Sequence, residues 1–154
     1  MTRLLRRSSP PGRAHRGSRR GQTLVEFALI LPIFILMLVG IFDFGRAVYA
    51  YNTISNASRE AVRIGIVDQN VSRLQAEAVK AAVALGAAPG DVDVAFRTPD
   101  LLGICAAPID IGCVVVITVH YQYNAATPII SNLVGTIDMA STTREPVERS
   151  YVSP

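Results

Sequence analysis

Hydrophobic and polar positions divide the chain into an uncharged run and a longer part in which apolar residues recur periodically. Residues 27–42 carry no charged side chain and lie between Glu26 and Asp43. Extended to residues 24–44, the run reaches about 20 residues, the length that an α-helix needs to cross the hydrocarbon core of a membrane. The pattern therefore predicts one membrane-spanning helix near the N-terminus.

Beyond this run, the spacing of apolar residues indicates that the helix, which begins near Gln22, continues to about residue 65. At helical spacing, one face is apolar and comprises Phe44, Ala47, Val48, Tyr51, Ile54 and Val62. The opposite face is polar and comprises Arg46, Thr53, Asn56, Glu60 and Arg63. Such amphipathic segments pack their apolar face on a folded domain. We expect the same here, outside the membrane.

A second helix and three strands are predicted in the remainder of the chain. Asp68 to Asn70 can cap a helix from Val71 to about Leu85, and Gly86 would end it. Alternation of apolar and polar residues indicates strands over residues 92–97, 114–123 and about 135–144. These elements predict an α+β fold, in which a small antiparallel sheet packs on the long helix. The predicted divisions are a leader, a helix and an exterior domain, over residues 1–21, 22–66 and 67–154.

Charge is distributed unevenly along the chain. Residues 1–21 contain seven arginines and no acid, whereas residues 22–154 contain the other eight Lys and Arg (15 − 7) and all twelve Asp and Glu. The basic leader should be disordered, and the positive-inside rule places it in the cytoplasm with the domain outside. A secretory signal cleaved after Ala50 is the alternative, although the uncharged run exceeds the about 7–15 apolar residues of such signals.

Candidate catalytic and metal-binding residues are few. The sequence contains neither a glycine-rich phosphate loop nor a paired-histidine metal motif. His15 lies in the leader, and His120 lies on the second face of a predicted strand. Asp91 and Asp93 resemble a fragment of a calcium loop but lack its glycine and closing glutamate. We expect no enzyme, metal or cofactor, and no nucleic-acid partner, since no groove-reading element accompanies the arginines.

Cys105 and Cys113 are the only cysteines. The segment between them, AAPIDIG, contains a proline and a glycine that can turn the chain back. In an oxidising compartment outside the cytoplasm, we expect this pair to form a disulfide. Two free buried thiols are the alternative.

The start of the helix carries a motif. Gly21 is followed by Gln22-Thr23-Leu24-Val25-Glu26, so the glutamate is the fifth residue after the glycine. This spacing, between a basic leader and an apolar run, resembles the processing signature of type IV prepilins. The stretches "EFALILP", "FDFGR" and "NASREAVRIG" are similar to TadE-like proteins of tight-adherence (Flp) pilus systems. The resemblance is close over residues 19–67, and it covers the outer domain only in plan, down to the final "TTREPVE".

The resemblance implies a minor pilin or pseudopilin of the inner membrane, cut after Gly21 by a prepilin peptidase. The implied partners are this peptidase, other pilin or pseudopilin subunits, the inner-membrane assembly platform and membrane lipid. Gln22 departs from the residues that often begin mature pilins, so methylation of the new terminus is not predicted. The alternative is a single-pass membrane protein that stays uncut and carries an exterior binding or sensor domain.

Glu26 and Pro32 are the functional candidates of the membrane segment. A carboxylate near the end of a membrane helix is costly unless a cation meets it. Cleavage after Gly21 would create one, the α-amine of Gln22, which could reach Glu26 of a neighbouring subunit; the alternative is a glutamate that extends to the membrane surface without a partner. Pro32 frees a carbonyl one turn earlier and should bend or loosen the helix, although prolines are also ordinary in membrane helices.

Overall fold

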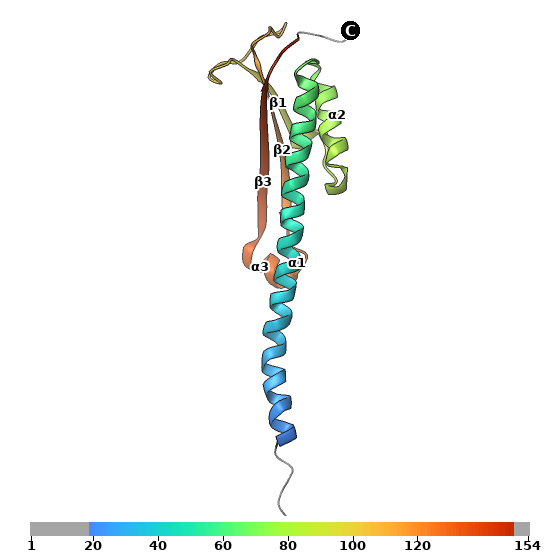
Figure 1. The fold of residues 1–154 in the computed structure, drawn as a ribbon, viewed down its shortest axis with the longest axis vertical. Coiled ribbons are helices and arrows are strands. Elements are labelled where there is room, and N and C mark those ends of the chain that lie inside the picture. The colour runs from blue at the N-terminus through green and yellow to red at the C-terminus, as the bar shows by residue number, and fades with distance from the viewer. Residues whose placement is uncertain (1–18, 150–154) are drawn as a thin grey trace, which may run out of the picture. The chain divides into compact units, whose positions relative to one another are not determined.

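The computed structural model describes residues 19–149, and Figure 1 shows their helices and strands. Most of the leader that was predicted to be disordered, residues 1–18, lies outside the described part. The chain divides into two units after Leu38, and each is described by itself. One helix, α1 (Arg19–Gly65), belongs to both.

In the first unit, α1 consists mainly of large apolar residues. Most of their side chains between Leu24 and Leu38 are at least half exposed. A helix satisfies nearly all its own backbone groups, as a low-dielectric surrounding requires of any segment that crosses it; here Pro32 leaves one carbonyl without its usual donor. Pro32 lies inside α1, which is continuous from Arg19 to Gly65.

The second unit contains all the other elements. Its helices are α2 (Val71–Ala81) and α3 (Pro128–Val134), with two 3-10 turns, η1 (Val83–Leu85) and η2 (Pro89–Asp91). Its strands are β1 (Val92–Arg97), β2 (Val114–Asn124) and β3 (Thr136–Pro146). The fold is therefore α+β, as predicted, with a long N-terminal helix on a three-stranded antiparallel sheet.

The helix predicted over residues 71–85 begins where expected but is shorter. The Asn70 side chain caps it by accepting a hydrogen bond from the Arg73 N–H at 3.2 Å. The Ala82 N–H donates to both Ala78 and Val79 carbonyls, at 3.0 and 3.1 Å. This shared hydrogen bond marks the change from α-helical to 3-10 geometry. The η1 turn follows, and Gly86 ends it with the left-handed φ of 71° that favours glycine.

β2 is the central strand of the sheet and pairs antiparallel with both neighbours. Val92 of β1 lies opposite Val119, and β3 pairs with β2 along its whole length, from Asn124 opposite Thr136 to Val114 opposite Pro146. On the inner face of β2, Val115, Ile117 and Val119 are fully buried. The predicted alternation of the strongest strand is thus confirmed.

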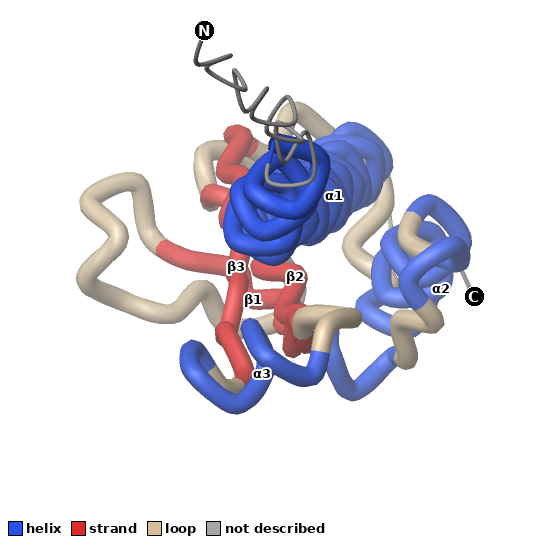
Figure 2. Tube along the Cα trace, turned by 90° about the horizontal axis from the view of Figure 1, so that it is seen from below, coloured by secondary structure: helices blue, strands red, loops and turns tan. Residues whose placement is uncertain are grey.

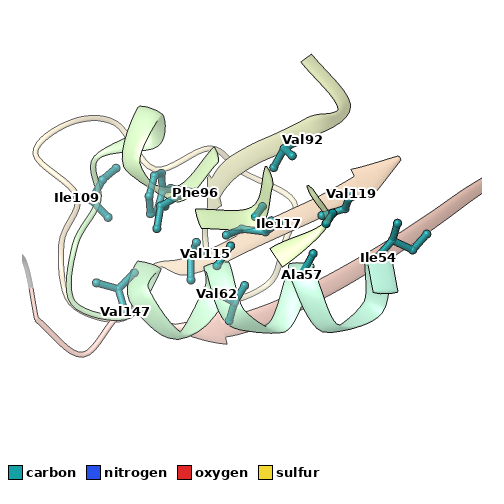
Figure 3. Packing of buried hydrophobic residues seen from close by; sticks show 14 of the residues in the cluster. Ile54, Ala57, Val62, Val92, Phe96, Ile109, Val115, Ile117, Val119 and Val147 are labelled. Carbon is teal, nitrogen blue, oxygen red and sulfur yellow. The ribbon is translucent and has the colours of Figure 1, made fainter. Parts of the chain in front are cut away.

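The core lies between the sheet and two helices, α1 and α2. α2 lies beside the second-unit part of α1 (Figures 1 and 2). Figure 3 shows Ala57 and Val62 on the side of α1 that faces Val115 and Ile117. The other buried members come from α1, α2, β1, β2 and the adjoining loops: Ile54, Ala61, Leu74, Ala78, Ala82, Val92, Phe96, Ile109, Cys113, Val119 and Val147.

The buried face of α1 differs from the predicted one. Ile54 and Val62 are buried, but Phe44, Val48 and Tyr51 are exposed. The inward positions hold mainly small residues: Ala50, Ala57, Ser58, Ala61 and Gly65. At Gly65 an added Cβ would lie 2.9 Å from a methyl carbon of Val115. A larger side chain would not fit where the helix approaches the sheet this closely, so side-chain size as well as hydrophobicity selects the inward residues.

Hydroxyl groups complete this contact between α1 and β3. The Ser58 Oγ lies 2.8 Å from the Thr143 Oγ1 and 3.4 Å from the Ser141 Oγ. It also donates to the Ser55 carbonyl at 3.0 Å, within its own helix. The buried polar side chain is therefore satisfied, as close packing of an interior requires.

A disulfide joins Cys105 and Cys113 in the loop between β1 and β2. We expect replacement of both cysteines by serine to lower the free energy of unfolding by ~2–3 kcal/mol, because the cross-link restricts the unfolded chain. Denaturation followed by circular dichroism would measure the loss, and reduced wild-type protein should show the same one. Ala106→Ser, at an exposed position between the cysteines, is the control and should be as stable as the oxidised wild type. If the double-serine variant and the reduced wild type were also equally stable, the bridge would have no structural role.

Candidate functional sites at the two ends of the uncharged run

The first end of the uncharged run contains Gly21, Gln22 and Glu26, all of them exposed. Gly21 lies in the first turn of α1, and no atom beyond its chain neighbours and helix backbone lies within 4 Å of the place where a Cβ would stand. The Gln22 Nε2 donates to the Glu26 Oε1 at 3.5 Å, one helical turn further on. The Gly21–Gln22 peptide bond is thus in the part of a helix that opens most readily.

Glu26 is the only charged residue that α1 carries between Gly21 and Asp43. Its neighbours on the helix are apolar and at least half exposed. A carboxylate in such surroundings is costly to bury in hydrocarbon and favours an arrangement that supplies a cation. Gln22 contributes only a long, neutral hydrogen bond, so the site can accept a positively charged group.

α1 is long and apolar enough to cross a membrane, by length and composition, within its Gly21–Gly65 portion. None of the most apolar stretch in this portion is buried against other described residues. Exposed hydrocarbon on this scale marks a surface that meets lipid or other protein. Pro32 lies in the same stretch.

The second end of the run is closed by Asp43, whose side chain is buried. Its carboxylate accepts hydrogen bonds from the backbone N–H groups of Ala126 and Thr127, at 3.0 and 3.3 Å, and from the Thr127 hydroxyl at 2.6 Å. Arg46 adds an ion pair at 3.6 Å, one turn along α1. A buried carboxylate is tolerated when its oxygens are satisfied in this way.

Tyr123 supports the same junction from the end of β2. Its hydroxyl donates to the Asp43 carbonyl at 2.7 Å, and the Arg46 guanidinium lies over its ring, 5.7 Å from the centroid. Burial raises the pKa of Tyr123, and the nearby Asp43 carboxylate raises this pKa further. The phenol therefore stays protonated at neutral pH and keeps its role as a donor.

Sequence reasoning named the first end as a site and missed the second. In the sequence, Asp43 was only the residue that closes the run. Three of its partners, Tyr123, Ala126 and Thr127, lie 80 to 84 positions later in the chain. The available signal was the same as for Glu26, an acidic residue beside hydrocarbon. An aspartate that is buried next to an apolar run needs hydrogen-bond or ion-pair partners. Nothing in the sequence identified which residues these are.

The remaining residues singled out from the sequence do not form a common site. The Asp91 carboxylate accepts the Ala88 N–H at 2.8 Å, as a cap of η2, whereas Asp93 lies 3.0 Å from the His120 Nε2. Among residues 19–149, no three His, Cys, Asp or Glu side chains are grouped so that they could hold a metal ion. His15 lies outside the described residues.

Comparison with protein families gave a match that lies within α1. Residues 21–63 match the family model described as TadE-like protein. The matched segment contains both ends of the uncharged run and covers less than a third of the chain. It confirms the resemblance seen in the sequence. Comparisons with curated proteins and with solved structures gave no match.

We expect Asp43→Ala to destabilise the second unit, because three donors and Arg46 lose their acceptor. Asp43→Asn should lose less stability, since the amide retains one acceptor oxygen. Thermal unfolding in detergent, followed by near-ultraviolet circular dichroism, would compare both with Asp138→Ala, which removes an exposed aspartate of β3. Equal melting temperatures for Asp43→Ala and Asp138→Ala would contradict this role.

Proposed function

We propose, from the premise that residues 21–63 form a TadE-like segment, that the chain is a membrane-anchored minor pilin or pseudopilin that assembles a tight-adherence pilus. The family match supports a pilus-related role in general. The observation that carries the finer proposal is the position of Glu26, five residues after Gly21, at the start of an exposed apolar helix. An ordinary anchor needs neither the glycine nor the acid.

The anchor is α1, inserted in the inner membrane with the leader in the cytoplasm. Exposed apolar side chains support insertion, and the seven arginines before Gln22 support the orientation. The second unit then lies outside, where the Cys105–Cys113 bridge is stable. Membrane lipid is accordingly the first partner of the chain.

Processing by a prepilin peptidase after Gly21 would leave α1 complete from Gln22 onward. A secretory signal cut after Ala50 fits the contacts of the second unit less well. Such a cut would remove Asp43, which binds Ala126 and Thr127, and also Ala50, which is buried. The second unit is thus built around residues that a secretory peptidase would discard.

Assembly would pair Glu26 of one subunit with the new α-amine of Gln22 on another. The exposed carboxylate and its weak intrachain hydrogen bond to the Gln22 side chain leave room for a charged partner. An ammonium–carboxylate pair in a low-dielectric bundle is stronger than in water. Other pilin subunits and the membrane assembly platform are the partners that this step needs. Pro32, by loosening the helix, would ease the subunit's departure from the bilayer.

Processing is tested by the mass of the membrane-bound chain. With its peptidase present, we expect a protein that begins at Gln22 and contains 133 residues (154 − 21). Gly21→Leu, which leaves the apolar run and Glu26 intact, should stay uncut. A wild-type chain found only at full length would favour the uncut anchor with an exterior binding or sensor domain. A chain that begins at Tyr51 would favour the secretory signal.

Charge pairing is tested by three substitutions at Glu26. Glu26→Ala and Glu26→Gln should be cut and inserted normally but be lost from cross-linked complexes with other pilins, because neither offers an ammonium a counter-charge. Glu26→Asp should be intermediate, since it keeps the charge with a shorter reach. Glu60→Gln, in the same helix beyond the run, should assemble as wild type. Normal complexes with Glu26→Gln would refute charge pairing, and loss of cleavage in all three would assign Glu26 to the peptidase.

A further inference from the structure

The connection between β2 and β3 is fastened to α1 at the end of the uncharged run. The Asp43 carboxylate binds the N–H groups of Ala126 and Thr127, directly before α3, and the Tyr123 hydroxyl binds the Asp43 carbonyl. Figure 1 shows α3 beside α1, at the end of the sheet where β2 and β3 meet. The position of α3 along the helix is therefore set by Asp43.

The connection between β2 and β3 is uncharged, and several of its exposed side chains are apolar. Residues 122–137 contain no Asp, Glu, Lys or Arg. Leu133 is 84 % exposed, Val134 53 % and Ile137 38 %. None of the three belongs to the core of the second unit, which is formed by other residues. Exposed apolar side chains that lie together in an uncharged stretch are typical of a surface that contacts lipid or protein.

The same surface is continuous with the end of the uncharged run. A pocket of about 210 Å³ lies between the two, and its apolar lining includes Gly40, Phe44, Ala47, Ile130, Val134 and Ile137. Gly40 precedes Asp43 by about 4.5 Å along the helix axis, at ~1.5 Å per residue. α3 thus lies level with the last turn of the segment that is apolar on all sides.

We propose that α3 and its flanking residues, 128–137, contact the lipid bilayer at the membrane surface. The proposal rests on the membrane anchoring of α1 proposed above. Lipid is favoured as the occupant because the patch adjoins the end of the apolar run, and the one acid between them, Asp43, is buried and satisfied by Ala126 and Thr127. Arg46, whose side chain is partly exposed, pairs with Asp43 at this end of the run, and arginine is a residue type that anchors proteins at this depth. The second unit then has two membrane contacts, the helix and the α3 surface.

The chain contains no tryptophan, so a single introduced tryptophan reports its own surroundings. Leu133→Trp would be placed in vesicles of phosphatidylethanolamine and phosphatidylglycerol that contain brominated phosphatidylcholine, which quenches tryptophan in contact with acyl chains. Leu102→Trp is the matched control, since Leu102 is 85 % exposed in the loop between β1 and β2. Phe34→Trp, within the uncharged run, reports insertion of α1 itself.

We expect the emission of Leu133→Trp to shift to shorter wavelength and to be quenched by the brominated lipid. Leu102→Trp should show neither effect. Quenching of Phe34→Trp without quenching of Leu133→Trp would overturn the α3 contact and leave the anchor intact. Absence of quenching at both positions would refute the anchor. A blue-shifted Leu133→Trp that brominated lipid does not quench would show that protein, such as a second copy, covers α3, and would also overturn the proposal.

Discussion

The Asp43 carboxylate is buried where the uncharged run of α1 ends, and its hydrogen bonds to Ala126 and Thr127 hold the β2–β3 connection on the helix. Over residues 27–42, α1 is apolar on all sides. After Asp43, one narrow stripe of mainly small residues packs on the sheet. A single helix therefore has an exposed apolar part and a part that packs on the sheet. The buried, hydrogen-bonded Asp43 lies where the one changes to the other. Because the second unit packs on the later part of this helix, from Ala50 to Gly65, that part of α1 cannot be removed without opening the core.

Local patterns were sufficient to predict most of the fold. The alternation around Val115, Ile117 and Val119 identified the central strand, and the Asn70 cap identified the start of α2. The buried face of α1 was predicted incorrectly, because helical periodicity ranks residues by hydrophobicity and therefore selected Phe44, Val48 and Tyr51. The close approach of Val115 to Gly65 is a tertiary constraint that favours small residues. α3 was missed, since its seven residues are fewer than the periodic signal of a helix needs.

The two ends of the uncharged run show why one site was found and the other was not. Gly21, Gln22 and Glu26 lie within six consecutive residues, so their relation is visible in the sequence itself. Asp43 acquires Tyr123, Ala126 and Thr127 only when the chain returns at the end of β2. No spacing rule connects residues so far apart. The family match extends across both ends. The matched segment includes Asp43 but none of Tyr123, Ala126 and Thr127. Only the structure therefore shows the contact between the helix and the domain.

The outer strands of the sheet are both protected against pairing with another strand. At β1, the Gln75 side chain donates to the Val92 carbonyl and the Cys105 N–H donates to the Phe96 carbonyl, both at 3.0 Å. β3 carries exposed Asp138, Arg144 and Glu145, and it ends at Pro146, which has no N–H to offer. These features disfavour edge-to-edge growth into aggregates. Where copies of the chain meet, strand addition at the sheet edges is therefore the disfavoured contact.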